Sequence, residues 1–331
     1  MALTRIAAII ATALTGLTII PALVFTFLSF RLRIFKRDPT KPWVFFLRAA
    51  LVTYSLWTIL YTAARGYEIE HLNNRDSDTD WRRNIYLTAP ILAQISTWML
   101  LIAQSLLLCT IWELLFTIQI PQAGGRTSRP RFARLAVHCF TALLLILAIA
   151  QFGLAVDADR SVYDDATSTP FVVPTQGQGG SNRIAANRML VAIAALLLIG
   201  TVGLVIVSAF ACARRGRGKY LRRSPVVALI GGILLSIVLS WDIARAALWV
   251  LLDKDMTSRS FPVWEPILTA VIRWIMLGIL IMLCNLAKER DSESWAVRKG
   301  PKGEMIVAPA LPECARAESW AGSSESGRGS M

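Results

Sequence analysis

Residues 189–223 of the chain read MLVAIAALLLIGTVGLVIVSAFACARRGRGKYLRR, an uncharged apolar run followed directly by a basic segment. A helix needs about 20 apolar residues to cross the hydrocarbon core of a bilayer, and residues 189–213 exceed that length. The pattern therefore predicts a membrane-spanning helix that ends in a cationic connector.

The same pattern recurs along the chain. Seven apolar stretches are long enough to span a bilayer. They lie at residues 6–30, 44–64, 87–118, 135–156, 189–213, 225–252 and 263–287. Only 17% of the residues are charged, below the roughly 25% that is usual in soluble domains. We therefore expect an all-α, polytopic membrane protein, with a seven-transmembrane helix bundle over residues 1–287.

The distribution of charge predicts the orientation. The first, third and fifth connectors are basic, with Arg37, Arg131 and Arg217 among their residues, whereas acidic residues such as Asp78 and Asp164 lie in the even connectors. Basic connectors remain in the cytosol. We expect the N-terminus outside and the C-terminus cytosolic, and residues 288–331 to form a disordered cytosolic tail because they lack apolar periodicity.

The net charge of +13 favours anionic lipid headgroups as partners. In a soluble protein such a charge would suggest nucleic acid, but here the basic residues flank apolar helices, so no nucleic acid is expected. We expect a multi-pass protein of the plasma membrane. Its predicted partners are membrane lipids, a small-molecule ligand and a cytosolic signalling protein that contacts the basic loops and tail.

Two opposite charges lie deep in the last two predicted helices. Asp242 and Arg273 are both about 15 Å from the outer ends of their helices, at a rise of about 1.5 Å per residue. An isolated charge at the bilayer centre costs about 2.5–3.5 kcal/mol on insertion scales. Consecutive helices with a short connector are usually antiparallel neighbours, so the sequence predicts an ion pair between Asp242 and Arg273.

Arg245 shares a helical face with Asp242 and leaves one positive charge in excess unless Glu265 also takes part. An anionic group of a ligand would balance that charge. Polar and aromatic stripes on the second, third and seventh helices are expected to face inward. The predicted ligand-binding lining of an outer-half cavity is Tyr54, Tyr61, Trp98, Asp242, Arg245 and Arg273. The alternative is that these groups only hold the helices in register.

Arg48 and Glu113 lie towards the inner ends of their helices, and we expect both to extend to the membrane interface. Glu113 and Asp242 also allow a membrane-embedded acid catalyst, of the kind used by integral-membrane terpene cyclases. The nearby arginines argue against Asp242 in that role, because a cation favours the carboxylate and removes the acidic proton.

Motifs for other chemistries are absent from the sequence. It contains no Walker loop, HExxH helix, GxSxG elbow or dinucleotide glycine motif, and its only histidines are His71 and His138. No lysine lies in a predicted membrane core, which excludes a retinal Schiff base. The sequence therefore indicates no cofactor and no metal site.

The topology resembles that of the G-protein-coupled receptors. The motifs differ, because Trp112-Glu113-Leu114 ends the third helix where rhodopsin-like receptors have Asp-Arg-Tyr, and Cys284-Asn285-Leu286-Ala287 ends the seventh helix without Asn-Pro-x-x-Tyr. Residues 89–99, APILAQISTWM, are similar to the third helix of the fungal RTA-type lipid-translocating exporters. Arg245 and Glu265 are also similar in placement to charged positions of that family. The resemblance implies a fungal seven-helix membrane protein.

These observations predict a receptor-like or lipid-handling membrane protein that binds a small amphipathic or anionic ligand in an outer-half cavity. A membrane-embedded biosynthetic enzyme and a purely structural membrane protein remain as alternatives.

Overall fold

The computed structural model describes residues 2–32, 42–73, 79–122, 129–168, 178–213, 219–251, 261–292, 295–299 and 305–309. Within this part of the chain, seven helical segments are long and apolar enough to cross a membrane. They are Ile6–Arg31, Pro42–Tyr67, Pro90–Thr117, Phe132–Ala158, Ser181–Ala213, Arg223–Ala247 and Trp264–Glu289. The predicted seven-helix bundle is confirmed. The chain is an integral, multi-pass membrane protein.

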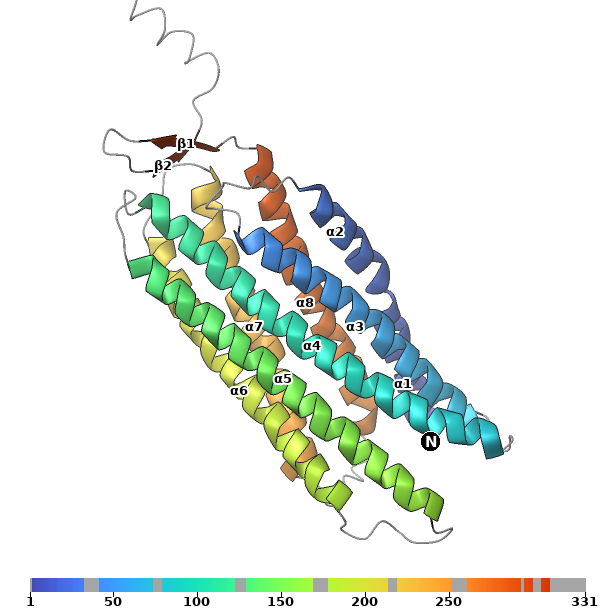
Figure 1. The fold of residues 1–331 in the computed structure, drawn as a ribbon. Helices are drawn as coiled ribbons and strands as arrows, with labels where there is room; N and C mark the ends of the chain where they lie inside the picture. The colour runs from blue at the N-terminus through green and yellow to red at the C-terminus, as the bar shows by residue number, and fades with distance from the viewer. Residues whose placement is uncertain are drawn as a thin grey trace, which may run out of the picture.

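Figure 1 shows the bundle and its helices. Their bounds are α1 (Ala2–Gly16), α2 (Ile19–Arg31), α3 (Pro42–Asn73), α4 (Thr79–Gln122), α5 (Arg129–Ser168), α6 (Gln178–Ala213), α7 (Lys219–Leu251) and α8 (Phe261–Ser292). Helices α1 and α2 together form the first span.

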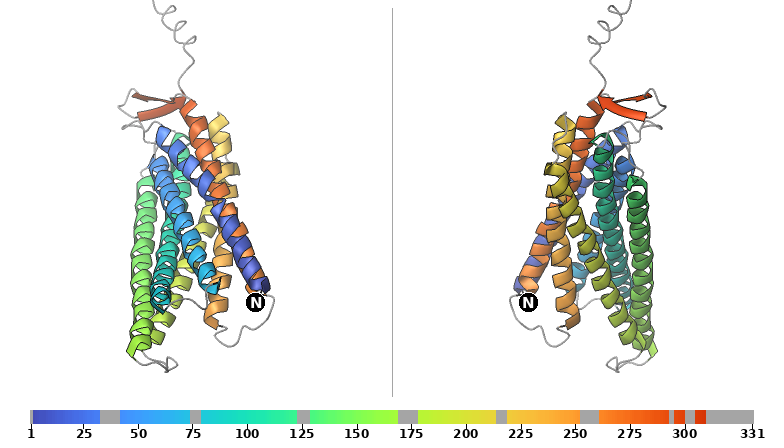
Figure 2. Two further views of the ribbon diagram at one scale, coloured as in Figure 1. Left: turned by 90° about the vertical axis from the view of Figure 1, so that its right-hand side faces the viewer. Right: turned by 90° about the vertical axis from the view of Figure 1, so that its left-hand side faces the viewer.

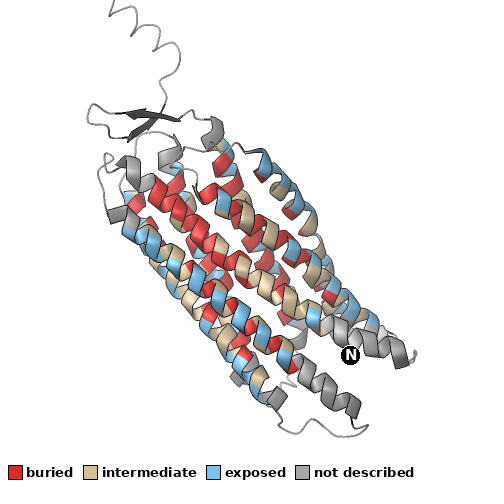
Figure 3. Cartoon of the chain, in the orientation of Figure 1, coloured by how far each residue is buried: buried red, intermediate tan, exposed pale blue. Residues whose placement is uncertain are grey.

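The spans pack in chain order and close into a ring. Each span from α3 to α8 contacts the next, and α1 returns to pack against α8. Helix α4 also contacts α6 and α7 and lies towards the middle of the bundle. Buried residues accordingly cover much of α4, whereas α2 and α5 present many exposed residues to the surroundings (Figure 3). In a bilayer those exposed apolar faces meet lipid.

The two ends of the bundle are distinct. The N-terminus lies at one end, and the C-terminal end of α8 lies at the other (Figure 2). We call the end with the N-terminus the outer end and the opposite end the inner end, following the orientation that the basic connectors predict. The assignment of the inner end to the cytosol stays a prediction.

The first span is broken at Leu17 and Thr18, where the sequence predicted one continuous helix. The amide of Thr18 donates to the carbonyl of Thr15 at 2.9 Å, so it does not reach Leu14. The carbonyl of Leu14 instead accepts a hydrogen bond from Trp274 Nε1 of α8 at 3.1 Å. Pro21, which has no amide hydrogen, fits the first turn of α2. The hydrogen bond that forms at this break therefore connects the first span to the last.

Several helices continue beyond their apolar stretches. Helix α4 begins at Thr79, α5 ends at Ser168 and α6 begins at Gln178, each about ten residues beyond the predicted span. Hydropathy marks only the part of a helix that lies in oil, whereas backbone hydrogen bonds can continue into water. The outer end therefore carries helical extensions.

Residues 295–309 contain a short antiparallel pair of strands. Strand β1 (Trp295–Lys299) pairs with β2 (Met305–Pro309), with Val297 opposite Val307. The sequence predicted disorder over residues 288–331, but α8 continues to Ser292 and the two strands have regular backbone. Disorder over residues 310–331 stays a prediction, because those residues lie outside the described part of the chain.

Candidate ligand-binding cavity

The predicted ion pair between the last two spans is present. Arg273 Nη2 on α8 lies 2.5 Å from Asp242 Oδ1 on α7, and Arg273 Nη1 donates to Asp242 Oδ2 at 3.1 Å. In this bidentate contact, each terminal nitrogen of the guanidinium meets one oxygen of the carboxylate. The opposite charges predicted to pair between these two helices thus do so.

Two residues of α3 hold Arg273 in place. The Tyr54 hydroxyl donates to the backbone carbonyl of Arg273 at 2.8 Å, and the ring of Trp57 lies 5.6 Å from the guanidinium carbon. Only 2% of the Arg273 side chain is exposed. A cation over an indole face is attracted by the ring quadrupole, so α3 supplies both a hydrogen bond and an aromatic wall.

Gln104 of α4 completes the arrangement around the carboxylate. Its Nε2 donates to Asp242 Oδ2 at 2.7 Å, and Gln104 itself is buried. Four helices, α3, α4, α7 and α8, therefore meet at one polar layer. Arg273 Nε has no hydrogen-bond partner among the described residues although it is buried, which leaves one donor of this layer free for a further acceptor.

A cavity of about 260 Å³ lies on the outer side of this layer, between α3, α4, α5, α6, α7 and α8. The polar and charged residues of its lining are Tyr61, Gln94, Ser96, Thr97, Gln104, Gln151, Arg183, Asn187, Asp242, Arg245, Thr269 and Arg273. Its apolar lining includes Trp57, Leu100 and Leu190. Apolar walls with a few convergent polar groups are typical of small-molecule sites.

Four of the six predicted lining residues border this cavity, namely Tyr61, Asp242, Arg245 and Arg273. Tyr54 and Trp98 do not. Tyr54 is fully buried against α8 through its bond to Arg273. The ring of Trp98 stacks on Phe152 of α5, with ring centres 5.3 Å apart. Both aromatic residues pack between helices and lie outside the lining of this cavity.

Glu265 pairs with Arg245, one of the two possibilities that the count of charges in the sequence left open. Arg245 Nη1 lies 3.6 Å from Glu265 Oε1, which makes a long ion pair. Thr269 Oγ1 donates to Glu265 Oε1 at 3.4 Å and accepts from Trp241 Nε1 at 3.2 Å. The carboxylate therefore balances Arg245 only loosely, since close pairs of this kind lie at about 2.7–2.9 Å.

Helices α5 and α6 also contribute to the cavity, which the sequence did not predict. Gln151 of α5 and Arg183 and Asn187 of α6 border the cavity. Gln151 is a lone amide in a long apolar run, which was a readable signal. Arg183 and Asn187 precede the apolar run, which begins only at Met189, whereas α6 begins at Gln178.

The cavity has an excess of positive charge. Its lining contains three arginines and one aspartate, and Asp242 is already bonded to Arg273. Even when the charge of Glu265 is counted against that of Arg245, Arg183 remains as a positive charge in excess. The arrangement can hold an anionic group by charge and orient it through the surrounding amides and hydroxyls.

Comparisons with known proteins identify no relative. No protein-family model, curated protein or solved structure matches the chain. The receptor and exporter resemblances therefore stay predictions from the sequence.

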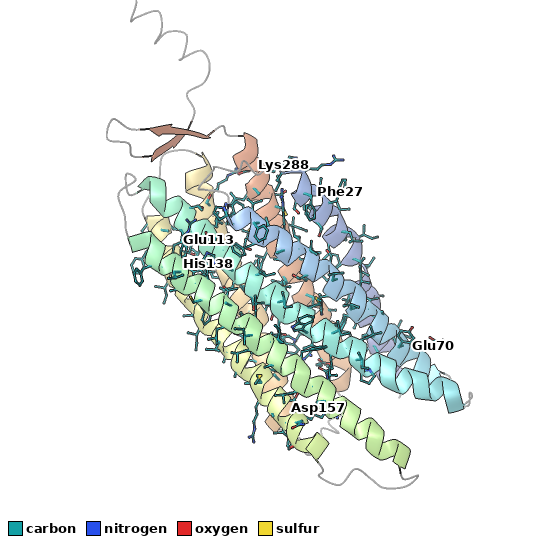
Figure 4. All side chains as sticks on the ribbon, in the orientation of Figure 1. Phe27, Glu70, Glu113, His138, Asp157 and Lys288 are labelled. Carbon is teal, nitrogen blue, oxygen red and sulfur yellow. The ribbon has the colours of Figure 1, made fainter. Side chains whose placement is uncertain are left out.

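A second charged cluster lies at the inner end, between α4 and α5. Glu113 is fully buried, and its Oε2 accepts a hydrogen bond from Arg134 Nη2 at 2.8 Å. His138 Nε2 lies 3.1 Å from Glu113 Oε1, close enough to pair but not aligned for a hydrogen bond. Figure 4 shows Glu113 and His138 close together on these neighbouring helices. The expectation that Glu113 extends to the interface was wrong, because it has partners within the bundle.

Arg48 also binds within the protein. Its Nε donates to the carbonyl of Ser29 at 2.9 Å, and its Nη2 donates to the carbonyl of Leu32. These carbonyls lie at the C-terminal end of α2, where the last helical acceptors lack amide partners and a cation is favourable. Arg48 thus caps α2 at the inner end of the first span, which ends at Arg31.

Proposed function

We propose that this chain is a receptor-like protein of the plasma membrane that binds a small anionic or amphipathic molecule in the cavity above the Asp242–Arg273 pair. The observation that carries the proposal is the excess of arginine in the cavity lining. Arg245, with its loose contact to Glu265, is the residue best placed to receive the anionic group. The amides of Gln94 and Asn187 would orient the remainder of the ligand.

The size of the cavity favours a small ligand. Sites for drug-sized molecules occupy about 300–1,000 Å³, and this cavity measures about 260 Å³. That volume suits a compact molecule better than a two-chain lipid. The receptor reading is therefore better supported than the lipid-handling reading.

The packing below the cavity also supports a binding site over a transport path. Leu107 and Ile111 of α4 and Met276, Leu277 and Leu280 of α8 are all fully buried on the inner side of the polar layer. Side chains at core density leave no room for a solute. A site closed on its inner side is expected of a receptor.

Acid catalysis has less support. Asp242 accepts from both Arg273 and Gln104, and Glu113 accepts from Arg134. Both carboxylates therefore already have arginine partners within the protein, so neither stands as a lone acid facing a substrate. The membrane-embedded enzyme is for this reason not our preferred function.

The proposal is tested by thermal unfolding of the purified protein in nanodiscs. Short-chain carboxylates and alkyl phosphates are compared with alkylamines of the same chain length. We expect the anions to raise the melting temperature and the amines to leave it unchanged, because a ligand that binds only the folded state stabilises it. Equal stabilisation by amines would contradict an anion site.

Three variants separate binding from structure. Arg245→Gln should abolish the shift caused by anions, and Arg245→Lys should retain part of it. Glu265→Gln removes the competing carboxylate, so anion binding should be kept or strengthened. If both Arg245→Gln and Glu265→Gln merely unfold the protein to the same degree, the pair is structural and the proposed site is wrong.

A further inference from the structure

A groove runs along the surface between α5 and α6, apart from the cavity. It is lined by Leu147 of α5 and by Ser181, Ile184, Arg188, Met189 and Ala192 of α6, together with Ala185. The α6 residues that border the cavity, among them Asn187 and Leu190, are different ones. The groove therefore faces the surroundings of the bundle, and almost all of its wall is apolar.

The groove has the length of one leaflet. Asp157 of α5 accepts a hydrogen bond from Asn182 Nδ2 of α6 at 2.7 Å near the outer end, where Figure 4 labels Asp157. At about 1.5 Å per residue, Leu147 and Ala192 both lie about 15 Å inward of that bond. The hydrocarbon core is about 30 Å thick, so the groove ends near the middle of the membrane.

Arg188 is a cation on the lipid-facing stripe of α6. Ile184, Ile199 and Ile206 are exposed on the same stripe, and Arg188 is exposed with them. It forms no ion pair with another residue in the described ranges. A cation inside a span needs a partner. Since side chains on a helix point towards its N-terminus, the guanidinium points towards the outer headgroups.

We propose that this groove binds one anionic phospholipid of the outer leaflet, with the phosphate on Arg188 and one acyl chain along the groove. Arg188 lies about 9 Å inward of the Asp157–Asn182 bond by the same rise, so its long side chain must extend outward to meet a phosphate at the headgroups. An acyl chain that starts from that phosphate would follow the groove inward past Met189 and Ala192. Arginine is well suited to phosphate because its planar fork donates two parallel hydrogen bonds.

A second copy of the chain is a poorer occupant. In a symmetric dimer the same patch lies on both partners, so the two Arg188 side chains would approach each other across an apolar contact. A lipid instead supplies the opposite charge and the flexible apolar chain together. The bilayer also presents lipid to this surface continuously.

Native mass spectrometry of the detergent-purified full chain tests the proposal. Phosphatidylglycerol is added at rising concentration, with phosphatidylcholine of the same acyl chains as the comparison. We expect one phosphatidylglycerol molecule to be retained more strongly than phosphatidylcholine. Arg188→Gln should weaken this retention about fivefold, the effect expected of one basic residue at an anionic surface, and Arg188→Lys should restore most of it.

A second pair of variants tests the groove itself. Ala192→Trp fills the groove, whereas Ala209→Trp adds the same ring to an exposed position nearer the inner end of α6. Only Ala192→Trp should reduce lipid retention. Unchanged retention in Arg188→Gln, equal retention of the two lipids, or equal effects of the two tryptophans would overturn the proposal. A dimer lost in Ala192→Trp but kept in Ala209→Trp would instead identify a second copy as the occupant.

Discussion

The hydroxyl of Tyr54 on α3 donates a hydrogen bond to the backbone carbonyl of Arg273 on α8, at 2.8 Å. The bond orients the α8 backbone at the residue whose side chain pairs with Asp242. Tyr54 thus supports the floor of the cavity from outside it, and it acts on Arg273 without facing a ligand.

Tyr54→Phe should lower stability modestly. The ring remains and one neutral hydrogen bond is lost, so we expect a loss of about 0.5–1.5 kcal/mol. Thermal unfolding in nanodiscs measures this. Tyr67→Phe is the matched control, because Tyr67 is an exposed residue of the same helix. Equal effects of the two variants would show that the bond to Arg273 contributes nothing.

Exchanging the two charges of the mid-membrane pair should restore a protein that either single change disables. Asp242→Arg leaves two buried arginines in contact, and Arg273→Asp leaves two carboxylates, each at a cost of about 3–5 kcal/mol. In the double variant the pair is reversed, and the amide of Gln104 can turn its oxygen to the new arginine. Surface expression measures the rescue, and its absence would contradict the observed contact.

Glu113→Gln should reduce protein abundance. The change leaves Arg134 facing a neutral amide, and we expect a loss of about 1–3 kcal/mol. Adding Arg134→Gln should recover part of that loss, since the two residues interact directly. Glu289→Gln is the control, because its partner Arg223 is exposed and such pairs contribute at most about 1 kcal/mol. Full abundance of Glu113→Gln would reopen the catalytic reading.

Alanine at two glycines should have opposite effects. A Cβ at Gly232 of α7 would meet Val205 Cγ2 of α6 at 3.0 Å, whereas a Cβ at Gly278 of α8 would meet nothing within 4 Å. We expect Gly232→Ala to cost about 1–3 kcal/mol by overpacking. Gly278→Ala should gain about 0.5–1 kcal/mol from helix propensity. Melting temperatures measure both, and a stabilised Gly232→Ala would contradict the close packing of α6 and α7.

The orientation can be mapped with glycosylation tags. A tag before α1 should be glycosylated, and a tag after residue 331 should not, because the basic connectors are predicted to remain in the cytosol. Two tags with the same outcome would contradict an odd number of spans. Exchange of the two outcomes would reverse our outer and inner ends.

The sequence predicted the spans and the central ion pair for clear physical reasons. Lipid requires long apolar runs, and an unpaired charge near the midplane is costly, so Asp242 and Arg273 could be paired by depth alone. Depth does not give the rotation of a helix about its axis. Tyr54 and Trp98 lie at suitable depths, yet they face neighbouring helices and not the cavity.

The partners of Glu113 escaped prediction because of a helix boundary. Arg134 immediately precedes the predicted apolar stretch, but α5 begins at Arg129 and places Arg134 and His138 one turn apart on the same helix. A basic residue next to an apolar run can belong to the helix and turn inward. The break at Leu17 and Thr18 had a visible signal in Pro21, but its bond to Trp274 depends on tertiary packing.

The pairing of Asp242 with Arg273 has a consequence for biosynthesis. Translation delivers α7 to the bilayer before α8, so for a short time Asp242 has the hydrogen bond from Gln104 but lacks its ion pair with Arg273. A nascent chain that stops before α8 lacks the guanidinium that pairs with Asp242. Synthesis of the last span therefore completes the polar layer that joins α4, α7 and α8.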